Sequence, residues 1–245
     1  MASISLASLE YLAEENPRAA AIQILRELRR RTEQAGLDTF YPDEGPLRRE
    51  LYVKYLKMFQ AGVDYSERCC LGGNRVGKTY GIGGYETAIH LTGLYPDWWE
   101  GWRVDHPILA WAAGTKATKV RDVNQKMLSG KIQPDRNLAG GLIPQARLQR
   151  FTRKSGVPDS IDQLFVKHVS GWINTLTFKS YEEGRTSFEA EAVDWIWLDE
   201  EPSRGIYDEC KLRLLTTRGR ILSTLTPVEG MTETIVGMLE GSEFL

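Results

Sequence analysis

The sequence predicts an α/β fold in which a mostly parallel central sheet carries helices on both faces. From residue 68 onward, short apolar runs typical of buried strands alternate with segments of helical periodicity. Two of these runs, "PILAWAAG" (107–114) and "VDWIWLD" (193–199), are apolar on both sides, as strands inside a parallel sheet are. A glycine-rich stretch, "CLGGNRVGKTYG" (70–81), connects the first strand to the helix that follows it.

Composition excludes several classes of protein. The chain is 42% hydrophobic and 26% charged, which is typical of a soluble globular domain. No run approaches the ~18 apolar residues that a membrane-spanning helix needs. The three cysteines, Cys69, Cys70 and Cys210, are too few for a disulfide framework.

The N-terminal part predicts a short helical segment ahead of the main domain. We place this segment at residues 1–45 and the domain at 46–245, with the turn-rich "YPDEGP" at the boundary. Asn16 and Gly36 are typical of the start and end of a helix. A second helix is expected over 47–60.

The remaining elements follow from periodicity and turn residues. They are expected as strand 68–71, helix 80–91, strand 107–114, helix 115–130, strand 175–181, strand 193–199, helix 204–215, strand 219–227 and helix 232–239. Thr115 is expected to cap its helix. Residues 130–158 are rich in glycine, proline and basic side chains, so a long surface excursion is expected there.

Charge is distributed unevenly along the chain. Between Lys116 and Lys154 there are ten Lys or Arg and two acids, whereas between Glu182 and Glu209 there are ten acids and two arginines. A basic segment can follow a phosphate backbone, and an acidic one can hold magnesium or meet a basic neighbour. Two solvated faces of opposite charge explain the same composition.

Residues 72–79 fit the pattern G-x-x-x-x-G-K-[ST] of a phosphate-binding loop, the Walker A motif. Glycines let successive N–H groups face a triphosphate, and the following helix N-terminus adds positive charge. Lys78 is expected to reach the β- and γ-phosphates, and Thr79 to bind Mg²⁺. The residues expected to hold the nucleotide are Gly72, Gly73, Asn74, Arg75, Val76, Gly77, Lys78, Thr79 and Tyr80.

Arg75 is an unusual residue inside such a loop. Its guanidinium can lie against the γ-phosphate and complement the charge that grows in the transition state. The alternative is a surface arginine with only a general attraction to phosphate.

A second motif, "WIWLDEE" (195–201), is an apolar strand that ends in carboxylates, as a Walker B strand does. Asp199 is expected to hold Mg²⁺, and Glu200 to orient and deprotonate the attacking water. A carboxylate base at this position favours a hydrolytic ATPase over a P-loop kinase or a GTPase that uses Gln. Glu201 is interpreted as a structural or solvated acid, and a plain buried strand with an acidic end is the alternative for the segment.

A third strand ends in "STLTP" (223–227). Hydroxyl groups at this strand tip could contact the γ-phosphate or its attacking water and report hydrolysis to the next helix. By chemistry alone, a Ser/Thr-rich strand end before proline is more often a simple turn.

In this order, "GGNRVGKT", "WIWLDEEP" and "STLTP" resemble the ATPase domain of the large terminase subunit of tailed bacteriophages. The segments "YPDWWEGWR" and "SYEEGRTSF" are also similar to that family, and the resemblance covers about residues 46–245. It implies a P-loop fold of the ASCE type and an ATP- and Mg²⁺-dependent motor that moves double-stranded DNA into a procapsid. It further implies a homo-oligomeric ring in the host cell cytoplasm, with the portal protein, the procapsid and the small terminase subunit as partners.

The resemblance also assigns residue roles. It implies a catalytic role in cis for Arg75, and it favours a coupling role over a turn for the hydroxyl residues of the third motif, Ser223, Thr224 and Thr226. Phe59 and Gln60 fall where the family contacts adenine, although Phe59 is equally compatible with a core position.

Arg185 is the candidate for an arginine that reaches the active site of a neighbouring copy. A surface salt bridge to Glu182 or Glu189 is the alternative.

Contacts with DNA are expected to be made to phosphates, because a motor that moves along any sequence has no use for base readout. The candidates are Lys116, Lys119, Arg121, Arg147, Arg150, Arg153 and Lys154. The last four are expected in a mobile loop, and a merely solubilising loop is the alternative. Trp98, Trp99 and Trp102 are expected to pack under the preceding helix.

Large terminase subunits also carry a C-terminal nuclease domain. The sequence ends at Leu245, soon after the coupling motif, so this chain is expected to have no nuclease activity. The alternative functions are another P-loop DNA-dependent ATPase, helicase-like or remodelling, and a small-molecule kinase, against which Glu200 argues. An intact pair of nucleotide motifs argues against a binding module with a degenerate site.

Overall fold

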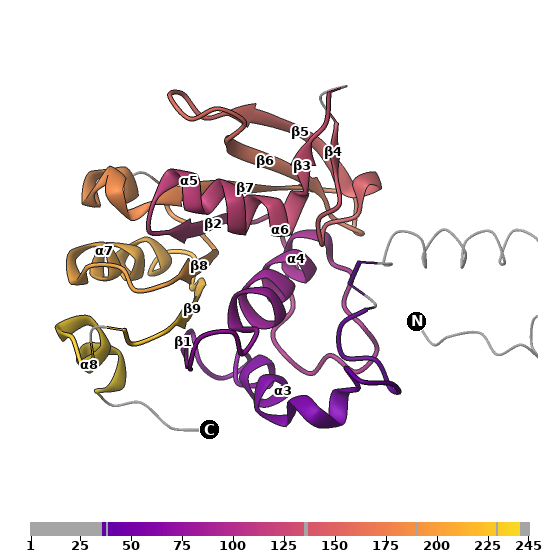
Figure 1. Cartoon of the computed structure of the whole chain (residues 1–245), viewed down its shortest axis with the longest axis horizontal. Helices are drawn as coiled ribbons and strands as arrows, with labels where there is room; N and C mark the ends of the chain where they lie inside the picture. Colours follow the sequence, from indigo (N-terminus) through magenta and orange to yellow (C-terminus); the bar gives the residue numbers. More distant parts are fainter. Residues whose placement is uncertain (1–35, 38, 135–136, 190, 229, 241–245) are drawn as a thin grey trace, which may run out of the picture.

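The computed structural model describes residues 36–37, 39–134, 137–189, 191–228 and 230–240 (Figure 1). The helix predicted ahead of Gly36 lies outside these residues. Within them, no helix is long and apolar enough to cross a membrane.

The described residues form a seven-stranded sheet with the order β1-β9-β8-β2-β7-β6-β5. Its strands are β1 (Glu67–Leu71), β2 (Leu109–Gly114), β5 (Leu148–Arg153), β6 (Ile161–Lys167), β7 (Ile173–Ser180), β8 (Trp195–Asp199) and β9 (Arg220–Leu225). Strands β1, β9, β8, β2 and β7 pair in parallel, whereas β6 and β5 pair antiparallel to their neighbours. The predicted α/β fold with a mostly parallel sheet is confirmed.

Helices cover both faces of this sheet, as predicted (Figure 1). They are the 3-10 helix Arg49–Tyr52, α3 (Val53–Gln60), the π-helical turn Lys78–Gly84, α4 (Tyr85–Thr92), α5 (Ala117–Val120), the π-helical turn Arg121–Gln125, α6 (Lys126–Ser129), the 3-10 helices Gln145–Arg147, Tyr181–Glu183 and Arg185–Phe188, α7 (Arg204–Leu214) and α8 (Glu233–Leu239). In Figure 1, α3 and α4 lie on one side of the parallel strands and α7 and α8 on the other.

The alternation of side chains along β8 explains the two layers. Successive residues of a strand point to opposite faces. Trp195 and Trp197 enter the core that contains α4, whereas Ile196 and Leu198 enter the core under α7 and α8. A strand that must be apolar on both faces therefore sits in the middle of the sheet.

Two glycines let the helix after the Walker A loop pack closely against β8 and α6. A Cβ on Gly83 would overlap the indole of Trp197, and one on Gly84 would overlap the sulfur of Met127. The predicted tryptophan packing is also confirmed in this layer, since Trp99 is buried and Trp98 and Trp102 pack against the same core.

In the middle of the chain, one prediction was wrong and one strand was not predicted. Residues 130–158 are not a long surface excursion, because they contain β5 and the two-stranded antiparallel sheet of β3 (Lys131–Ile132) and β4 (Leu138–Ala139). Strand β6 was missed altogether.

The helix that follows β2 is also not capped by Thr115. Lys116 is the N-cap residue and makes no side-chain cap. A side chain distant in the sequence supplies the capping hydrogen bond instead, because Glu182 Oε1 accepts the N–H of Ala117 at 2.6 Å. The Glu182 N–H in turn donates to the Thr115 carbonyl at 3.3 Å. The cap is therefore a tertiary contact, which no local pattern can predict.

Candidate active site

The predicted motifs meet at the carboxyl edge of the parallel strands. Strand β9 lies between β1 and β8, and its register places Thr224 beside Asp199 and Leu225 beside Leu71. The loop after β1, the strand end "STLTP" and the acidic end of β8 are therefore neighbours, although they lie far apart in the sequence. Open α/β sheets bind ligands at such an edge.

Lys78 is the central cation of the site. Its side chain is largely buried, with 6% of the residue exposed. The ammonium group donates to the carbonyls of Gly72 at 2.8 Å and Gly73 at 2.7 Å, and to Thr226 Oγ1 at 3.0 Å. All three protons are thus directed at the loop and the tip of β9, where an anion in the loop would meet them.

The loop backbone has two left-handed residues, Arg75 with φ 63° and Gly77 with φ 87°. Glycine adopts this conformation freely, whereas an arginine is strained in it. Two tyrosine hydroxyls bond to the backbone of the loop and of the helix that follows it. Tyr55 donates to the Val76 carbonyl, and Tyr41 donates to the Gly81 carbonyl at 2.5 Å. Arg75 itself is exposed.

Asp199 is the buried acid of the site, with 7% of the residue exposed. Its Oδ1 accepts hydrogen bonds from Thr79 Oγ1 and Thr224 Oγ1, each at 2.9 Å, and Asn124 Nδ2 lies 3.5 Å from Oδ2. Burial raises the pKa of Asp199 to about 6, although the two threonine hydroxyls act to lower it. A carboxylate beside a threonine oxygen is the type of oxygen donor that Mg²⁺ prefers.

Trp197 sets the direction of the bond between Thr224 and Asp199. Its indole Nε1 donates to Thr224 Oγ1 at 2.9 Å. A hydroxyl has a single proton, and the indole N–H can only donate. With the Thr224 oxygen accepting from Trp197, its proton is free to be donated to Asp199 Oδ1.

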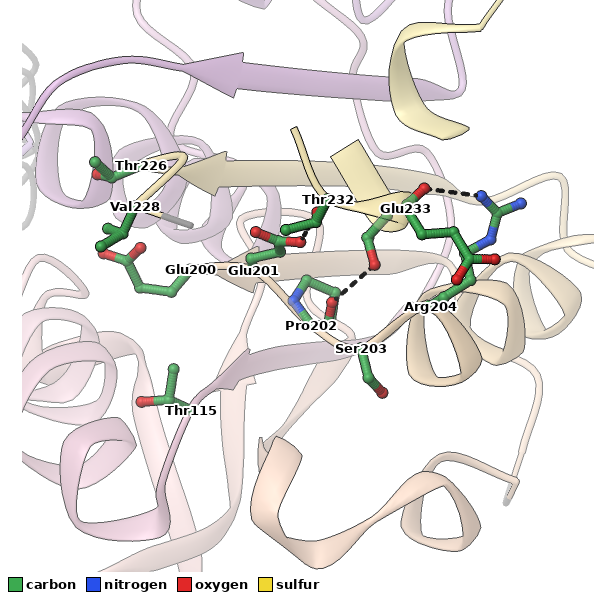
Figure 2. A pocket seen from close by; sticks show the side chains of 11 residues that line it. Thr115, Glu200, Glu201, Pro202, Ser203, Arg204, Thr226, Val228, Thr232 and Glu233 are labelled. Atoms are coloured by element: carbon green, nitrogen blue, oxygen red, sulfur yellow. Dashed lines mark hydrogen bonds between the residues drawn. The ribbon is translucent and has the colours of Figure 1, made fainter. Parts of the chain in front are cut away.

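Glu200 lines a pocket of about 550 Å³ beside this cluster (Figure 2). Figure 2 shows its side chain between Thr115, at the end of β2, and Val228, beyond the tip of β9. Glu201 lines the same pocket, and its Oε1 accepts the hydroxyl of Thr232. This contact agrees with the structural interpretation of Glu201.

A family model described as "Terminase large subunit, T4likevirus-type, N-terminal" matches residues 69–244. The chain belongs to this family. It is therefore the N-terminal ATPase domain of a large terminase, which confirms the resemblance inferred from the motifs.

A curated relative agrees with this assignment. The large terminase subunit of Salmonella phage P22 is 31% identical, over 77% of this chain and 41% of the relative. The terminase domain thus spans less than half the length of that relative.

Two solved structures are also similar to the terminase domain. The large terminase of a thermophilic bacteriophage is 12% identical with a TM-score of 0.49, over 77% of this chain and 42% of that one. A mutant of the Thermus phage P74-26 large terminase ATPase domain is 14% identical with a TM-score of 0.40, over 69% of this chain and 62% of that one.

Among the hydroxyl residues of the third motif, for which a coupling role is expected, two of the three point to the site. Thr224 and Thr226 contact Asp199 and Lys78, respectively. Ser223 lies between Leu222 and Thr224 on β9, so its side chain points to the opposite face of the sheet.

The two predicted adenine contacts lie on α3 of the terminase domain. Phe59 is 1% exposed and packs among Tyr41, Tyr85 and Trp99, so the core interpretation of this residue is the one the structure supports. Gln60 is exposed at the end of the helix. Tyr80, next to Thr79, is exposed and stacks on Phe40 with ring centroids 5.1 Å apart.

Arg185 is paired inside the terminase domain. Its guanidinium lies 3.0 Å from Glu209 Oε2 and 3.4 Å from Glu189 Oε1, while the side chain is 60% exposed. Of the two salt-bridge partners predicted as the alternative, Glu189 is present, and Glu182 instead caps the helix that starts at Ala117.

The candidate DNA contacts fall on two elements. Lys116 and Lys119 are exposed around α5, and Arg121 pairs with Asp122 at 2.8 Å. Arg150 and Arg153 lie on β5, Arg147 ends the 3-10 helix before it, and Lys154 directly follows it. The four residues therefore do not form one loop, which corrects that prediction.

Most of the basic residues around β5 already have contacts. Arg150 lies over the Phe165 ring at 3.8 Å, and Arg153 pairs with Asp159 at 3.6 Å. Lys154 pairs with Glu183 at 2.5 Å, and its side chain is only 15% exposed.

Two contacts of the site were not predicted, although the sequence carried a signal for each. Asn124 is a polar residue on the apolar face of its helix, four residues after Val120 and three before Met127, and such a residue needs a buried partner. Trp197 is in a strand that is buried on both faces, so its N–H also needs an acceptor.

Proposed function

We propose that this terminase domain binds ATP with Mg²⁺ in the Walker A loop and hydrolyses it to drive double-stranded DNA into a procapsid. The observation that carries the proposal is the hydrogen-bonded cluster of Lys78, Thr79, Asp199, Thr224 and Thr226 at one edge of the sheet. It joins the phosphate-binding, metal-binding and coupling motifs into one unit.

The cation side of the site binds the phosphates. The loop N–H groups and the Lys78 ammonium donate hydrogen bonds to the phosphate oxygens. For the ammonium, these oxygens replace the Gly72 and Gly73 carbonyls as acceptors. Arg75, already turned into a left-handed conformation, complements the charge on the γ-phosphate from the same chain.

The acidic side fits a magnesium ion. Among the described residues there is no group of three acidic, histidine or cysteine side chains that could hold a metal alone. Mg²⁺ in nucleotide sites is bound by one or two protein oxygens, with phosphates and water as the other ligands. Thr79 Oγ1 and Asp199 Oδ1 supply such a pair, and the bound ion would neutralise the buried carboxylate and screen the phosphates.

Glu200 acts on water. It follows the metal-binding acid directly and lines the pocket that opens beside Thr226, so a water in that pocket lies within reach of its carboxylate. Glu200 orients this water and accepts its proton during attack on the γ-phosphate.

The coupling of ATP hydrolysis to a movement of the domain follows from the position of β9. Thr226 contacts the lysine that holds the phosphates, and Thr224 contacts the acid that holds the metal. Loss of the γ-phosphate changes the acceptors around both groups, and β9 passes the change to α8, which follows it.

The partners of the whole protein follow from the family. They are double-stranded DNA, the portal protein and procapsid, the small terminase subunit and further copies of this chain in a ring. In the ring, Arg185 leaves Glu209 and Glu189 and reaches the neighbouring site. The main domain, 46–245, carries the motor, and a nuclease would have to be supplied by another segment or chain.

The test is the ATPase rate of the wild type and of Glu200→Ala, measured against protein concentration with and without duplex DNA. The wild-type rate per chain should rise with concentration and with DNA. Glu200→Ala should bind an ATP analogue with wild-type affinity and lose about 100-fold or more in kcat, as removal of a general base does.

The design separates the parts of the proposal. Turnover of Glu200→Ala at the wild-type rate contradicts the general-base role. A rate that is independent of both concentration and DNA contradicts the ring motor while leaving nucleotide hydrolysis intact.

A further inference from the structure

The backbone of Glu200 is held in a conformation that a residue with a Cβ rarely adopts. Its φ is 63°, in the left-handed region, directly after the regular strand β8. Such residues persist only where their surroundings fix them, and they concentrate at functional sites. The contacts that hold this residue are therefore informative.

Two neighbours fix the Glu200 peptide groups. The Glu200 N–H donates to the Thr224 carbonyl at 3.0 Å, which extends the ladder between β8 and β9 by one residue. The hydroxyl of Tyr181 lies 3.0 Å from the Glu200 carbonyl and 3.2 Å from the Asp199 carbonyl. A phenol has one proton, so this bond is shared between the two acceptors.

The surroundings of Tyr181 favour the protonated form of its hydroxyl, which is the form that donates. Burial raises the pKa of its hydroxyl well above the ordinary value, and the nearby carboxylates of Asp199 and Glu200 raise it further. Its ring packs against the core under α7, next to Phe188.

The segment that carries Tyr181 is anchored on both sides. Before it, the Ser180 N–H donates to Glu183 Oε2 at 3.0 Å, and Glu183 pairs with Lys154 at 2.5 Å. After it, Glu182 binds the start of the helix at Ala117 and the carbonyl of Thr115. Thr115 lines the pocket that Glu200 also lines, so the same short segment braces two walls of this pocket.

We infer that Tyr181 is a positioning residue for the general base. Its hydroxyl holds the carbonyls of Asp199 and Glu200 and so keeps the Glu200 carboxylate directed into the pocket beside Thr226. The inference rests on the proposed function of Glu200 and adds a residue that acts through it without touching the reacting atoms.

The test is Tyr181→Phe, which removes the hydroxyl and keeps the ring. We expect kcat to fall about tenfold, equivalent to a loss of about 1.4 kcal/mol in transition-state stabilisation, with KM for ATP within about twofold. Rates are normalised to the concentration of sites that bind an ATP analogue, so partial unfolding does not count as lost catalysis.

Tyr207→Phe is the matched control. Tyr207 is a buried tyrosine, and its hydroxyl bonds to Glu67, which begins β1 and so lies at the opposite edge of the sheet. This variant should keep kcat within about twofold of the wild type while losing a comparable hydrogen bond.

A double variant decides whether Tyr181 acts through Glu200. In a Glu200→Gln background, measured by single turnover, Tyr181→Phe should cause no further loss of rate. An equal loss in both backgrounds, or a wild-type kcat for Tyr181→Phe, overturns the inference. If Glu200→Gln itself turns over normally, the proposed function fails instead, so the two failures are distinguishable.

Discussion

The parallel and antiparallel parts of the sheet carry their polar residues in different ways. Strands β1, β9, β8, β2 and β7 all end at one edge, so polar residues from distant segments meet there and form the cluster around Lys78 and Asp199. Strands β5 and β6 run antiparallel to each other, and the basic residues along β5 find partners singly, as Arg153 does with Asp159. Polar residues from different segments therefore form one shared site only where the topology brings the ends of several strands together.

The largest effect should be a loss of nucleotide affinity in a Lys78→Ala variant. Lys78 lies at the carboxyl edge of the parallel strands, called the parallel edge below. This change removes the only ammonium group that bonds the loop carbonyls among the described residues, so the affinity for an ATP analogue should fall about 100-fold or more, equivalent to about 2.7 kcal/mol. Titration with a fluorescent analogue measures it. Lys57→Ala, an exposed lysine on α3, should bind as the wild type does. Tight binding by Lys78→Ala would mean that the parallel edge is not the nucleotide site.

The same comparison explains which elements the sequence could predict. Strand β8 is apolar on both faces, so its sequence alone indicates a buried parallel strand. Strand β5, "LQRFTR", is an edge strand with only two half-buried positions, and locally it is indistinguishable from a polar loop. Its pairing with β6 depends on long-range contacts, which explains why residues 130–158 were wrongly predicted to form a surface excursion.

The residues of the site also divide into those that the sequence could predict and those that it could not. Walker A and Walker B residues were predictable because each motif is continuous and the chemistry of each residue type is specific. The contact of Arg185 with Glu209 and the cap of the helix start at Ala117 were not, because Glu209 lies 24 residues from Arg185 and Glu182 lies 65 residues from Ala117. Tyr181 carried no local signal at all, since its acceptors are the backbone carbonyls of a strand end 18 and 19 residues away.

An effect of similar size should appear in the stability of the nucleotide-free protein, through Asp199. Its pKa is raised from 3.8 to about 6, so the folded state holds this proton more tightly than the unfolded state does. The contribution to the free energy of unfolding is therefore largest below about pH 4 and is lost as the pH rises through 6, by on the order of 3 kcal/mol. Chemical denaturation between pH 4 and 7 measures this loss.

The Asp199→Asn variant should lack this part of the pH dependence and should be more stable than the wild type at pH 7. Asp97→Asn, at an exposed position, should follow the wild-type profile. If Asp199→Asn keeps the full wild-type slope, the buried carboxylate is not the source of the slope, and the parallel edge is less enclosed than the geometry indicates.

The smallest effect should come from the antiparallel edge, with Arg150→Ala and Arg153→Ala combined. Arg150 contacts an aromatic face and Arg153 a weakly held acid, so both guanidinium groups can turn to a DNA phosphate at little cost. Loss of two phosphate contacts should reduce the slope of log affinity against log salt by about 2 and weaken binding of duplex DNA several-fold at low salt.

Fluorescence anisotropy with a labelled duplex, measured over a range of salt concentrations, provides this slope. Lys57→Ala again serves as the control for removal of a positive charge far from β5. An unchanged slope in the double variant would assign the basic residues of β5 to a solubilising surface. Phosphate contacts would then be sought in the parallel part of the fold, where Lys116 and Lys119 are exposed around α5.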